Sequence, residues 1–196
     1  MKKLRLANII PVSDANGPGP HFTIWVQGCS LRCPGCFNPH THDPNGGYSR
    51  TIPSLIHEIK KYWEQKQIRG VSITGGEPLQ QIDSLTNLLQ EIKAIGNIGT
   101  IVLSGYNKSE LQSIPGFDRL KQYTDVLISG RFLYEKKLQK EIRGSTNKEI
   151  LFYSSFYHHE EFETIPPLEV FTDSDGSICI TGIKPEILEG VLKAQR

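Results

Sequence analysis

The sequence has almost no net charge, no long apolar run and few cysteines, and each of these absences excludes a class of protein. Lysines and arginines total 22 against 21 aspartates and glutamates, so the chain lacks the basic surface that nucleic-acid binding requires. It contains no run of about 18 apolar residues, so no membrane-spanning helix is predicted. The basic start at residues 1–5 is followed by Asn8 and Pro11 before any apolar stretch. No signal peptide is therefore predicted, and the expected location is the cytoplasm.

The composition is typical of one folded domain with a small addition. The chain has 196 residues, of which 37% are hydrophobic and 22% are charged. This is enough apolar material for a core and too much for a disordered chain. No repeat of fixed period and no low-complexity tract is visible. The sequence therefore predicts a globular protein.

Three of the four cysteines lie close together. Cys29, Cys33 and Cys36 fall within eight residues, whereas Cys179 is far along the chain. Four cysteines could form two disulfides, but a reducing cytoplasm disfavours them. Clustered thiols in such a compartment are more often metal ligands or redox groups. Cys179 lies between two isoleucines and is expected to be a half-buried thiol outside any metal site.

Short apolar runs alternate with segments of helical spacing. Two stripes of apolar residues predict two helices. The stripe at 55–63 belongs to a helix that starts at Thr51, and the stripe at 82–95 belongs to a helix that stops at Gly96. A third, short helix is expected near 109–113. This rhythm predicts βαβ units, and hence an α/β fold with a mainly parallel sheet. The apolar runs predict buried strands at residues 22–26, 71–73, 100–103, 125–128 and 150–152.

The C-terminal part of the chain has a different pattern. Two alternating runs within residues 168–183 flank Asp175-Gly176, which is a strong signal for a β-hairpin. Residues 185–194 predict a short closing helix, and Pro166-Pro167 marks a boundary. We therefore expect a core domain at residues 1–165 and a C-terminal extension at residues 166–196 that packs on it.

Glycines and polar residues follow the predicted strands at the positions where ligands bind. In parallel α/β folds, ligands gather at the carboxyl ends of the strands. Four such ends are occupied by Gly28-Cys29, Thr74 to Glu77, Ser104-Gly105 and Ser129 to Arg131. The sequence therefore predicts a site where these strand ends meet.

The spacing of the clustered cysteines suits a metal centre. Gaps of three and two residues let the thiolates of Cys29, Cys33 and Cys36 converge, and Pro34-Gly35 suits a tight loop between them. Thiolate ligands favour zinc or an iron–sulfur cluster. A four-iron cluster held by three cysteines leaves one iron with an open position for chemistry.

Two other interpretations of the cysteine loop stay open at this point. Structural zinc takes four ligands, so a zinc site would need His40 or His42 as the fourth. A redox pair formed by Cys33 and Cys36 is also possible, but it would leave Cys29 without a role.

A second motif follows the strand after the cysteine loop. Gly75 and Gly76 allow a ligand to approach the backbone closely, and carbonyl groups together with the Glu77 carboxylate can hold an ammonium group. Alone, such a motif usually marks a turn. Beside a three-cysteine loop it favours a ligand site.

These motifs resemble the radical S-adenosylmethionine (SAM) superfamily. Its signature stands here as Cys29-x-x-x-Cys33-x-x-Cys36 together with Gly75-Gly76-Glu77. The chain is most similar to one branch, the activating proteins of anaerobic ribonucleotide reductase, which are small glycyl-radical activases related to the pyruvate formate-lyase activase. The resemblance covers residues 8–155, and the segments that carry it are Asn16 to Pro20, Val26 to Cys29, Cys33 to Pro39, Thr74 to Leu79, Ser104 to Tyr106, Asp125 to Leu127 and Arg143 to Asn147.

The resemblance implies a fold, two cofactors and a set of residues that hold them. The implied fold is an incomplete, open (βα) barrel, and the implied ligands of a [4Fe–4S] cluster are Cys29, Cys33 and Cys36. An electron from the cluster would cleave SAM to methionine and a 5′-deoxyadenosyl radical, which would take hydrogen from a backbone glycine of a partner enzyme. The implied SAM contacts are Gly35, Cys36, Phe37, Gly75, Gly76, Glu77, Ser104, Ser129 and Arg131.

The same resemblance implies partners. They are a glycyl-radical enzyme as protein substrate and an electron donor such as flavodoxin or ferredoxin, with no nucleic acid and no membrane. The chain departs from the family pattern in three places: Gly35 precedes the third cysteine where many members have an aromatic residue, Ser129 stands where the branch often has aspartate, and the chain extends beyond about residue 160. Two alternatives stay open, namely a radical SAM enzyme for another peptide or small molecule, and a non-enzymatic iron–sulfur or zinc module.

Overall fold

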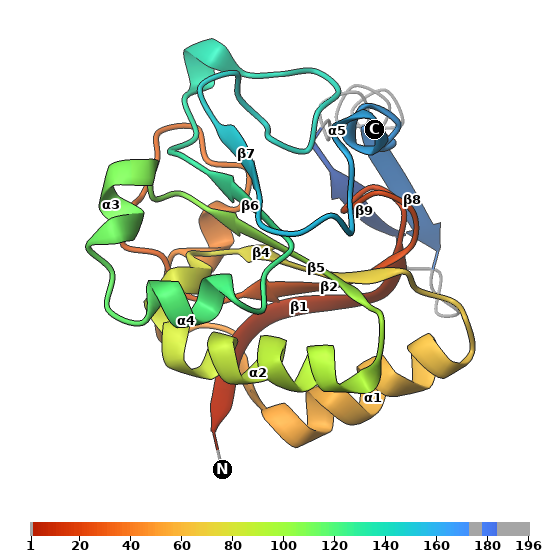
Figure 1. Ribbon diagram of the computed structural model, residues 1–196. Coiled ribbons are helices and arrows are strands. Elements are labelled where there is room, and N and C mark those ends of the chain that lie inside the picture. The colour runs from red at the N-terminus through yellow and green to blue at the C-terminus, as the bar shows by residue number, and fades with distance from the viewer. Residues whose placement is uncertain (1, 173–177, 184–196) are drawn as a thin grey trace.

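A mixed sheet runs through the computed structural model, which describes residues 2–172 and 178–183 (Figure 1). Four central strands, β2, β4, β5 and β6, are parallel to one another, while β1 and β7 run antiparallel to their neighbours on either side. In spatial order, the seven strands of this sheet within the described residues are β3 (Tyr48–Thr51), β1 (Lys3–Ser13), β2 (His21–Val26), β4 (Gly70–Gly75), β5 (Gly99–Ser104), β6 (Val126–Ser129) and β7 (Glu149–Phe152). The predicted α/β class is confirmed.

All five predicted strands are present, and β1 and β3 are additional. The sequence pattern did not reveal β1 because its pairing with β2 shifts register twice, between Leu6 and Asn8 and between Ile10 and Ser13. Each such irregularity breaks the alternation of inward and outward side chains by which a strand is recognised. The antiparallel β1 and β7 extend the predicted parallel sheet at both sides.

Two long helices lie side by side on one face of the sheet (Figure 1). They are α1 (Ile52–Glu64) and α2 (Ile82–Ile95), which confirms both predicted helices. Thr51 is the N-cap of α1, where its side chain accepts a hydrogen bond from the backbone nitrogen of Ser54 at 3.3 Å. The predicted short helix is α3 (Lys108–Gln112), and the remaining short helices are α4 (Phe117–Lys121), α5 (His159–Glu163) and the 3-10 turns η1 (Pro39–Thr41), η2 (Pro78–Gln81) and η3 (Tyr134–Lys136).

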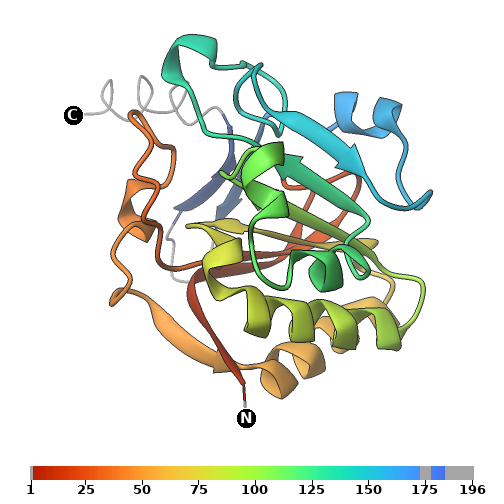
Figure 2. The same ribbon diagram turned by 60° about the vertical axis from the view of Figure 1, so that its left-hand side comes forward.

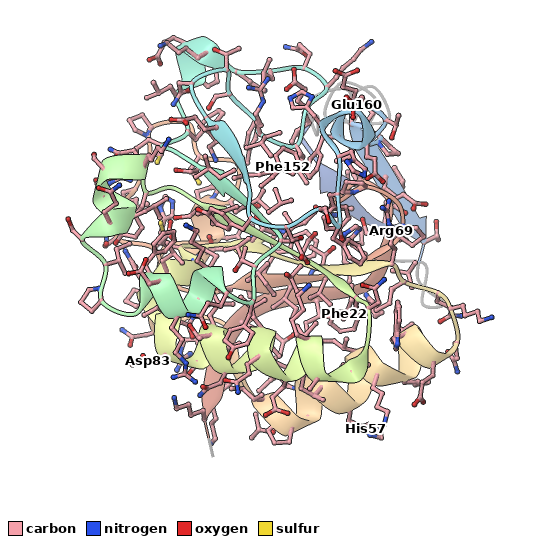
Figure 3. The ribbon with its side chains drawn as sticks, in the orientation of Figure 1. Phe22, His57, Arg69, Asp83, Phe152 and Glu160 are labelled. Atoms are coloured by element: carbon pink, nitrogen blue, oxygen red, sulfur yellow. The ribbon has the colours of Figure 1, made fainter. Side chains whose placement is uncertain are left out.

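Alternate residues of the strands point to opposite faces of the sheet and so supply two cores. Phe22 lies between the sheet and the helices, whereas His57 projects outward from α1 (Figure 3). On strand β6, Leu127 joins this helix-side core, while its neighbours Val126 and Ile128 join a second core on the other face. None of the helices within the described residues is long and apolar enough to cross a membrane.

The C-terminal hairpin lies on the face of the sheet opposite α1 and α2 (Figures 1 and 2). Its strands are β8 (Leu168–Thr172) and β9 (Ile178–Gly182), paired antiparallel with Val170 opposite Ile180. The strands confirm the predicted hairpin. The predicted turn at residues 175–176 and the predicted helix at residues 185–194 lie outside the described residues.

One carboxylate fastens this hairpin to the core. Glu169 Oε2 accepts hydrogen bonds from Ser13 Oγ at 2.7 Å and from the backbone nitrogens of Asp14 and Ala15 at 3.0 and 3.3 Å. These donors lie at the end of β1 and just beyond it, beside the amino end of β2, where Ser13 pairs with His21. The extension is therefore fastened at the end of the parallel strands opposite to the one where the sequence predicts the site.

Candidate functional site

A cavity of about 380 Å³ opens at the carboxyl ends of β2, β4 and β5, where parallel sheets commonly bind ligands. It brings together residues from both motifs of the sequence. The predicted site residues that line it are Cys29, Cys33, Cys36, Phe37, Gly75, Gly76, Glu77 and Ser104. Gly35, Ser129 and Arg131 are not among the residues that line it.

The loop that carries the cysteines is held in place by its own backbone. At its start, the nitrogens of Gly28 and Cys29 donate to the carbonyl oxygens of Thr41 and His42 at 2.8 and 3.2 Å. The nitrogen of Cys36 donates to the carbonyl oxygen of Cys33 at 3.1 Å, which closes the turn that contains Pro34 and Gly35. The three thiols are therefore presented by an ordered loop.

Burial controls the protonation of two of these thiols. Desolvation raises the pKa of Cys29 and of Cys36, and the neighbouring Cys33 thiol adds to this effect. Without metal, both groups are therefore protonated thiols at neutral pH. A metal centre would convert them into thiolates, because only the deprotonated sulfur is a good ligand.

The arrangement does not suit a single metal ion. Within the described residues, no three His, Cys, Asp or Glu side chains lie close enough together to hold one. His40 and His42 line the same cavity, but they do not complete the compact four-ligand set that structural zinc requires. A cluster of several irons places a different demand on its ligands, because they bind around the outside of a larger body and need not meet at one atom.

The glycines after β4 bring that strand against the base of the cysteine loop. The nitrogens of Gly76 and Glu77 donate to the carbonyl oxygens of Val26 and Gly28 at 2.8 and 2.9 Å. A Cβ on Gly76 would lie only 2.3 Å from the Gly28 oxygen, and Gly75 has a φ of +100°. The sequence interpretation assigned these glycines to ligand approach; in the structure, they also allow two segments of the chain to meet.

Glu77 is almost completely buried, with 1% of its surface exposed. Its Oε1 accepts hydrogen bonds from the Leu79 nitrogen and from Ser104 Oγ, both at 2.9 Å, and its Oε2 accepts one from the Gly105 nitrogen at 2.7 Å. Desolvation raises the pKa of this carboxyl, and the three donors oppose that rise. A carboxylate oxygen can accept two hydrogen bonds, so Oε2 can still accept one from a ligand.

The remaining predicted contacts are engaged with other parts of the protein. Ser129 Oγ donates to the carbonyl oxygen of Tyr106 at 2.8 Å. The guanidinium of Arg131 pairs with both carboxylate oxygens of Glu110, at 3.0 and 2.8 Å. Gly35 lies against the ring of Tyr134. Their contact with a ligand stays a prediction.

Lys148 is a site residue that the sequence did not reveal. It lines the cavity together with Glu77, Cys33 and Cys36. Burial lowers the pKa of Lys148, while electrostatic interaction with these three residues opposes the change. The only available signal was its position directly after Asn147, the last residue of a family motif.

The C-terminal hairpin brings the fourth cysteine to the same cavity. Cys179 on β9 lines the cavity together with Cys29, Cys33 and Cys36. None of these four is in a disulfide. Their proximity could not be foreseen, because the hairpin returns to the site from more than 140 residues along the chain.

Comparison with known proteins agrees with this donor set. The sequence profile of the 4Fe-4S single cluster domain matches residues 15–151, which include all three clustered cysteines. The chain belongs to the 4Fe-4S single cluster family. The matched range also includes Glu77 and Lys148.

Several individual proteins that are similar to this chain are named as activating proteins. The anaerobic ribonucleoside-triphosphate reductase-activating protein of Enterobacteria phage T4 is 32% identical over 147 residues, which are 72% of this chain and 90% of that protein. The protein of the same name from Escherichia coli K12 is 33% identical over 145 residues, 70% of this chain and 92% of its own. The pyruvate formate-lyase-activating enzyme of Listeria monocytogenes is 29% identical over 161 residues, and the match spans only 64% of its length.

Proposed function

We propose that this protein is a radical SAM enzyme that activates a glycyl-radical partner enzyme of the anaerobic ribonucleotide reductase type. The observation that carries the proposal is one cavity that unites the thiols of Cys29, Cys33 and Cys36 with the buried carboxylate of Glu77. These donors stand beyond the carboxyl ends of the two parallel strands β2 and β4, and the matching relatives are named as activating proteins of this kind.

The cavity offers separate donors for the two cofactors. Cys29, Cys33 and Cys36 would hold a [4Fe–4S] cluster, and Glu77 Oε2 would accept a hydrogen bond from the ammonium group of SAM. When bound together, these cofactors supply an electron and a 5′-deoxyadenosyl radical that abstracts hydrogen from a glycine of the partner. The chain contributes binding, orientation and a partly enclosed site. Phe37, whose ring packs against Phe132 at 4.5 Å between centroids, supplies an apolar wall.

The same proposal includes the further SAM contacts, the electron donor and the cellular compartment. Gly35, Gly75, Gly76, Ser104, Ser129 and Arg131 are proposed as additional contacts or as supports of the SAM site. A flavodoxin or a ferredoxin is the proposed source of electrons. The cytoplasm is the proposed compartment, because the half-buried thiols must stay reduced until iron is bound.

We also propose that the sheet is the incomplete, open barrel of the radical SAM type. In support, its strands β2, β4, β5 and β6 are parallel, and its edge strands β3 and β7 do not pair with each other within the described residues. The division into a core at residues 1–165 and an extension at residues 166–196 belongs to the same proposal. Its support is that Glu169 and Thr181 of the hairpin hydrogen-bond to residues 13–16 of the core.

A second candidate is a radical SAM enzyme that modifies a different peptide or small molecule. The observation that favours it is the hairpin at residues 168–182, which borders the cavity through Cys179 and Ile180 but lies outside the residues matched by the family. A substrate that reached the cavity past this hairpin would meet a surface that the family match does not cover.

The decisive experiment is anaerobic. The protein is reconstituted with iron and sulfide, reduced with dithionite and given SAM, and 5′-deoxyadenosine is measured by chromatography with the Cys33→Ala variant as control. We expect product from the wild type and none from the variant. Addition of an anaerobic ribonucleotide reductase should then produce a glycyl radical signal in electron paramagnetic resonance.

Each alternative has its own outcome in this experiment. Formation of 5′-deoxyadenosine without any glycyl radical on the reductase would favour the second candidate. Protein with about four irons per chain that neither binds nor cleaves SAM, even with the reductase present, would indicate an electron-transfer module. Zinc in place of iron, in protein purified without oxygen, would support the zinc interpretation.

A further inference from the structure

Lys148 is a cation of the cavity that forms no ion pair with any of the described residues. Arg143 and Lys148 both line the cavity. Arg143 is occupied, because its Nε donates to Glu141 at 2.7 Å and its Nη1 donates to the carbonyl oxygen of Lys148 at 3.3 Å. Within the described residues, the ammonium group of Lys148 makes neither a hydrogen bond nor an ion pair. It therefore has its hydrogen-bonding capacity available to a ligand.

The backbone of Lys148 is held in place by hydrogen bonds, which fixes the point at which its side chain enters the cavity. Its nitrogen donates to the carbonyl oxygen of Ser145 at 3.2 Å, and its carbonyl oxygen accepts from Arg143. Its Cα and Cγ lie so close to Gly130 that a Cβ on that glycine would be 3.4 Å from each. The preceding residue, Asn147, donates to the carbonyl oxygen of Arg131 at 2.9 Å.

The groups around the Lys148 ammonium indicate which kind of ligand group it would bind. Glu77, Cys33 and Cys36 line the same cavity and are near enough to interact with it electrostatically. The proposed function assigns the three thiols to iron and Glu77 to the ammonium group of SAM. The methionyl end of SAM also carries a carboxylate, which can accept a charge-assisted hydrogen bond from a cation. Arg131, the cation that the sequence suggested nearby, is already paired with Glu110.

We propose that Lys148 Nζ binds the carboxylate of the methionyl end of SAM. This inference rests on the proposed function and adds a residue to it. Glu77 and Lys148 then recognise the two ends of the amino-acid group. An isolated ammonium in a buried site is unfavourable, and a carboxylate that pairs with it removes this cost and contributes a charge-assisted hydrogen bond.

The test compares two ligands that differ in this carboxylate alone. Cluster-loaded protein without reductant is dialysed against SAM or against decarboxylated SAM, so that binding is measured without cleavage. The variants are Lys148→Met and Lys148→Gln, which remove the charge, and Lys148→Arg, which keeps it. The matched control is Lys136→Met, at an exposed lysine of η3. Iron and sulfide are determined for every variant.

We expect both neutral variants to bind SAM about tenfold to a hundredfold more weakly than the wild type, the usual effect of losing a hydrogen bond between charged groups. Their affinity for decarboxylated SAM should stay within about twofold of the wild type, since that ligand has no carboxylate to lose. Lys148→Arg should retain most of the affinity for SAM, and Lys136→Met all of it.

Three results would overturn the assignment. Unchanged SAM affinity in both neutral variants would remove Lys148 from the site. An equal loss for SAM and for decarboxylated SAM would show that the lysine only supports the shape of the cavity, and so would loss of iron from both neutral variants. If loaded wild-type protein bound no SAM at all, the proposed function would fail together with this inference, which distinguishes that case from the others.

Discussion

At the scale of single residues, Glu77 connects the ends of β4 and β5 with the base of the cysteine loop. Its carboxylate receives hydrogen bonds from Leu79, Ser104 and Gly105, which fixes the end of β4 against the end of β5. Its own backbone nitrogen donates to Gly28 at the base of the cysteine loop. A residue proposed to bind SAM through its side chain therefore also contacts, through its backbone, the loop proposed to bind iron.

The same scale separates cluster ligands from a bystander thiol. We expect Cys33→Ala to lower the iron content after anaerobic reconstitution at least about tenfold, because a cluster held by three thiolates cannot lose one of them. Cys179→Ala should keep about four irons per chain, since Cys179 comes from a separate hairpin. Iron analysis and the absorbance of the cluster measure both.

Of the two variants, Cys179→Ala is the more informative, because Cys179 lines the same cavity as the three clustered cysteines. Loss of the cluster in Cys179→Ala alone would mean that the hairpin provides a ligand and that the assignment to three cysteines is wrong. Retention of the cluster in Cys33→Ala would have the same consequence for that residue.

At the scale of secondary-structure elements, the hairpin is attached to the core by a small number of polar contacts. Glu169 Oε2 is shared by three donors at residues 13–15, and Asn16 Nδ2 donates to Thr181 Oγ1 at 2.9 Å. On its outer surface, Val170 and Ile178 are 48% and 59% exposed. An element fastened in this way can open locally without unfolding of the sheet.

We therefore predict that Glu169→Ala loosens the hairpin selectively. Loss of the charged acceptor should cost about 1.5 kcal/mol of local stability, which corresponds to about tenfold faster hydrogen exchange at the paired amides of β8 and β9. Exchange in β5 should not change. Hydrogen–deuterium exchange with mass spectrometry measures both regions, with Glu135→Ala at an exposed position as control.

Equal acceleration in β5 and in the hairpin would contradict this view, because it would mean that the hairpin and the sheet open as one unit. No change in either region would mean that the contact between Asn16 and Thr181, with the packing around it, is sufficient to hold the hairpin.

At the scale of the whole molecule, the two ends of the parallel strands have different tasks. The carboxyl ends surround the cavity, while the amino ends are closed by buried His21 and Tyr157. His21 Nδ1 donates to the carbonyl oxygen of Gly19 at 2.8 Å, which leaves Nε2 to accept from the Tyr157 hydroxyl at 2.7 Å. Arg69, labelled in Figure 3, lies over the ring of Tyr157 and forms an ion pair with Glu161 of α5.

This cluster predicts a pH dependence of global stability. Burial lowers the pKa of His21 from 6.5 to about 4, so the folded protein keeps the imidazole neutral. Above about pH 6.5 neither state binds this proton. Between pH 6.5 and 4, the unfolded chain takes it up and the folded protein does not, so stability falls as the pH decreases. From pH 7 to pH 5 the expected loss is about 2 kcal/mol.

Urea unfolding of the metal-free protein at pH 7 and pH 5 measures this loss. The matched variant is His21→Gln, which keeps polar atoms at the position but does not titrate. The variant is less stable than the wild type at pH 7, and its decrease toward pH 5 should be smaller by about 2 kcal/mol. An identical decrease in both proteins would show that other groups produce the pH dependence.

Much of this architecture was predictable from local patterns. Helices α1 and α2 have apolar stripes with recognisable ends, and the strands of the parallel sheet are short apolar runs followed by glycine or polar residues. The cysteine spacing and Gly75-Gly76-Glu77 both encode chemistry within a few residues. Strand β1 was missed because its irregular register with β2 hides the alternation.

The sequence by itself determined the α/β class, the cysteine loop and the proposed donors of the cavity, since each depends on residues that are neighbours in the chain. Only the tertiary structure decided that Lys148 lines the same cavity as Glu77, that Arg131 is paired with Glu110, and that Cys179 reaches that cavity. These relations depend on how distant segments pack and which charges they bring together. Pairing of that kind is set by the whole fold and leaves no periodic or local pattern in the sequence.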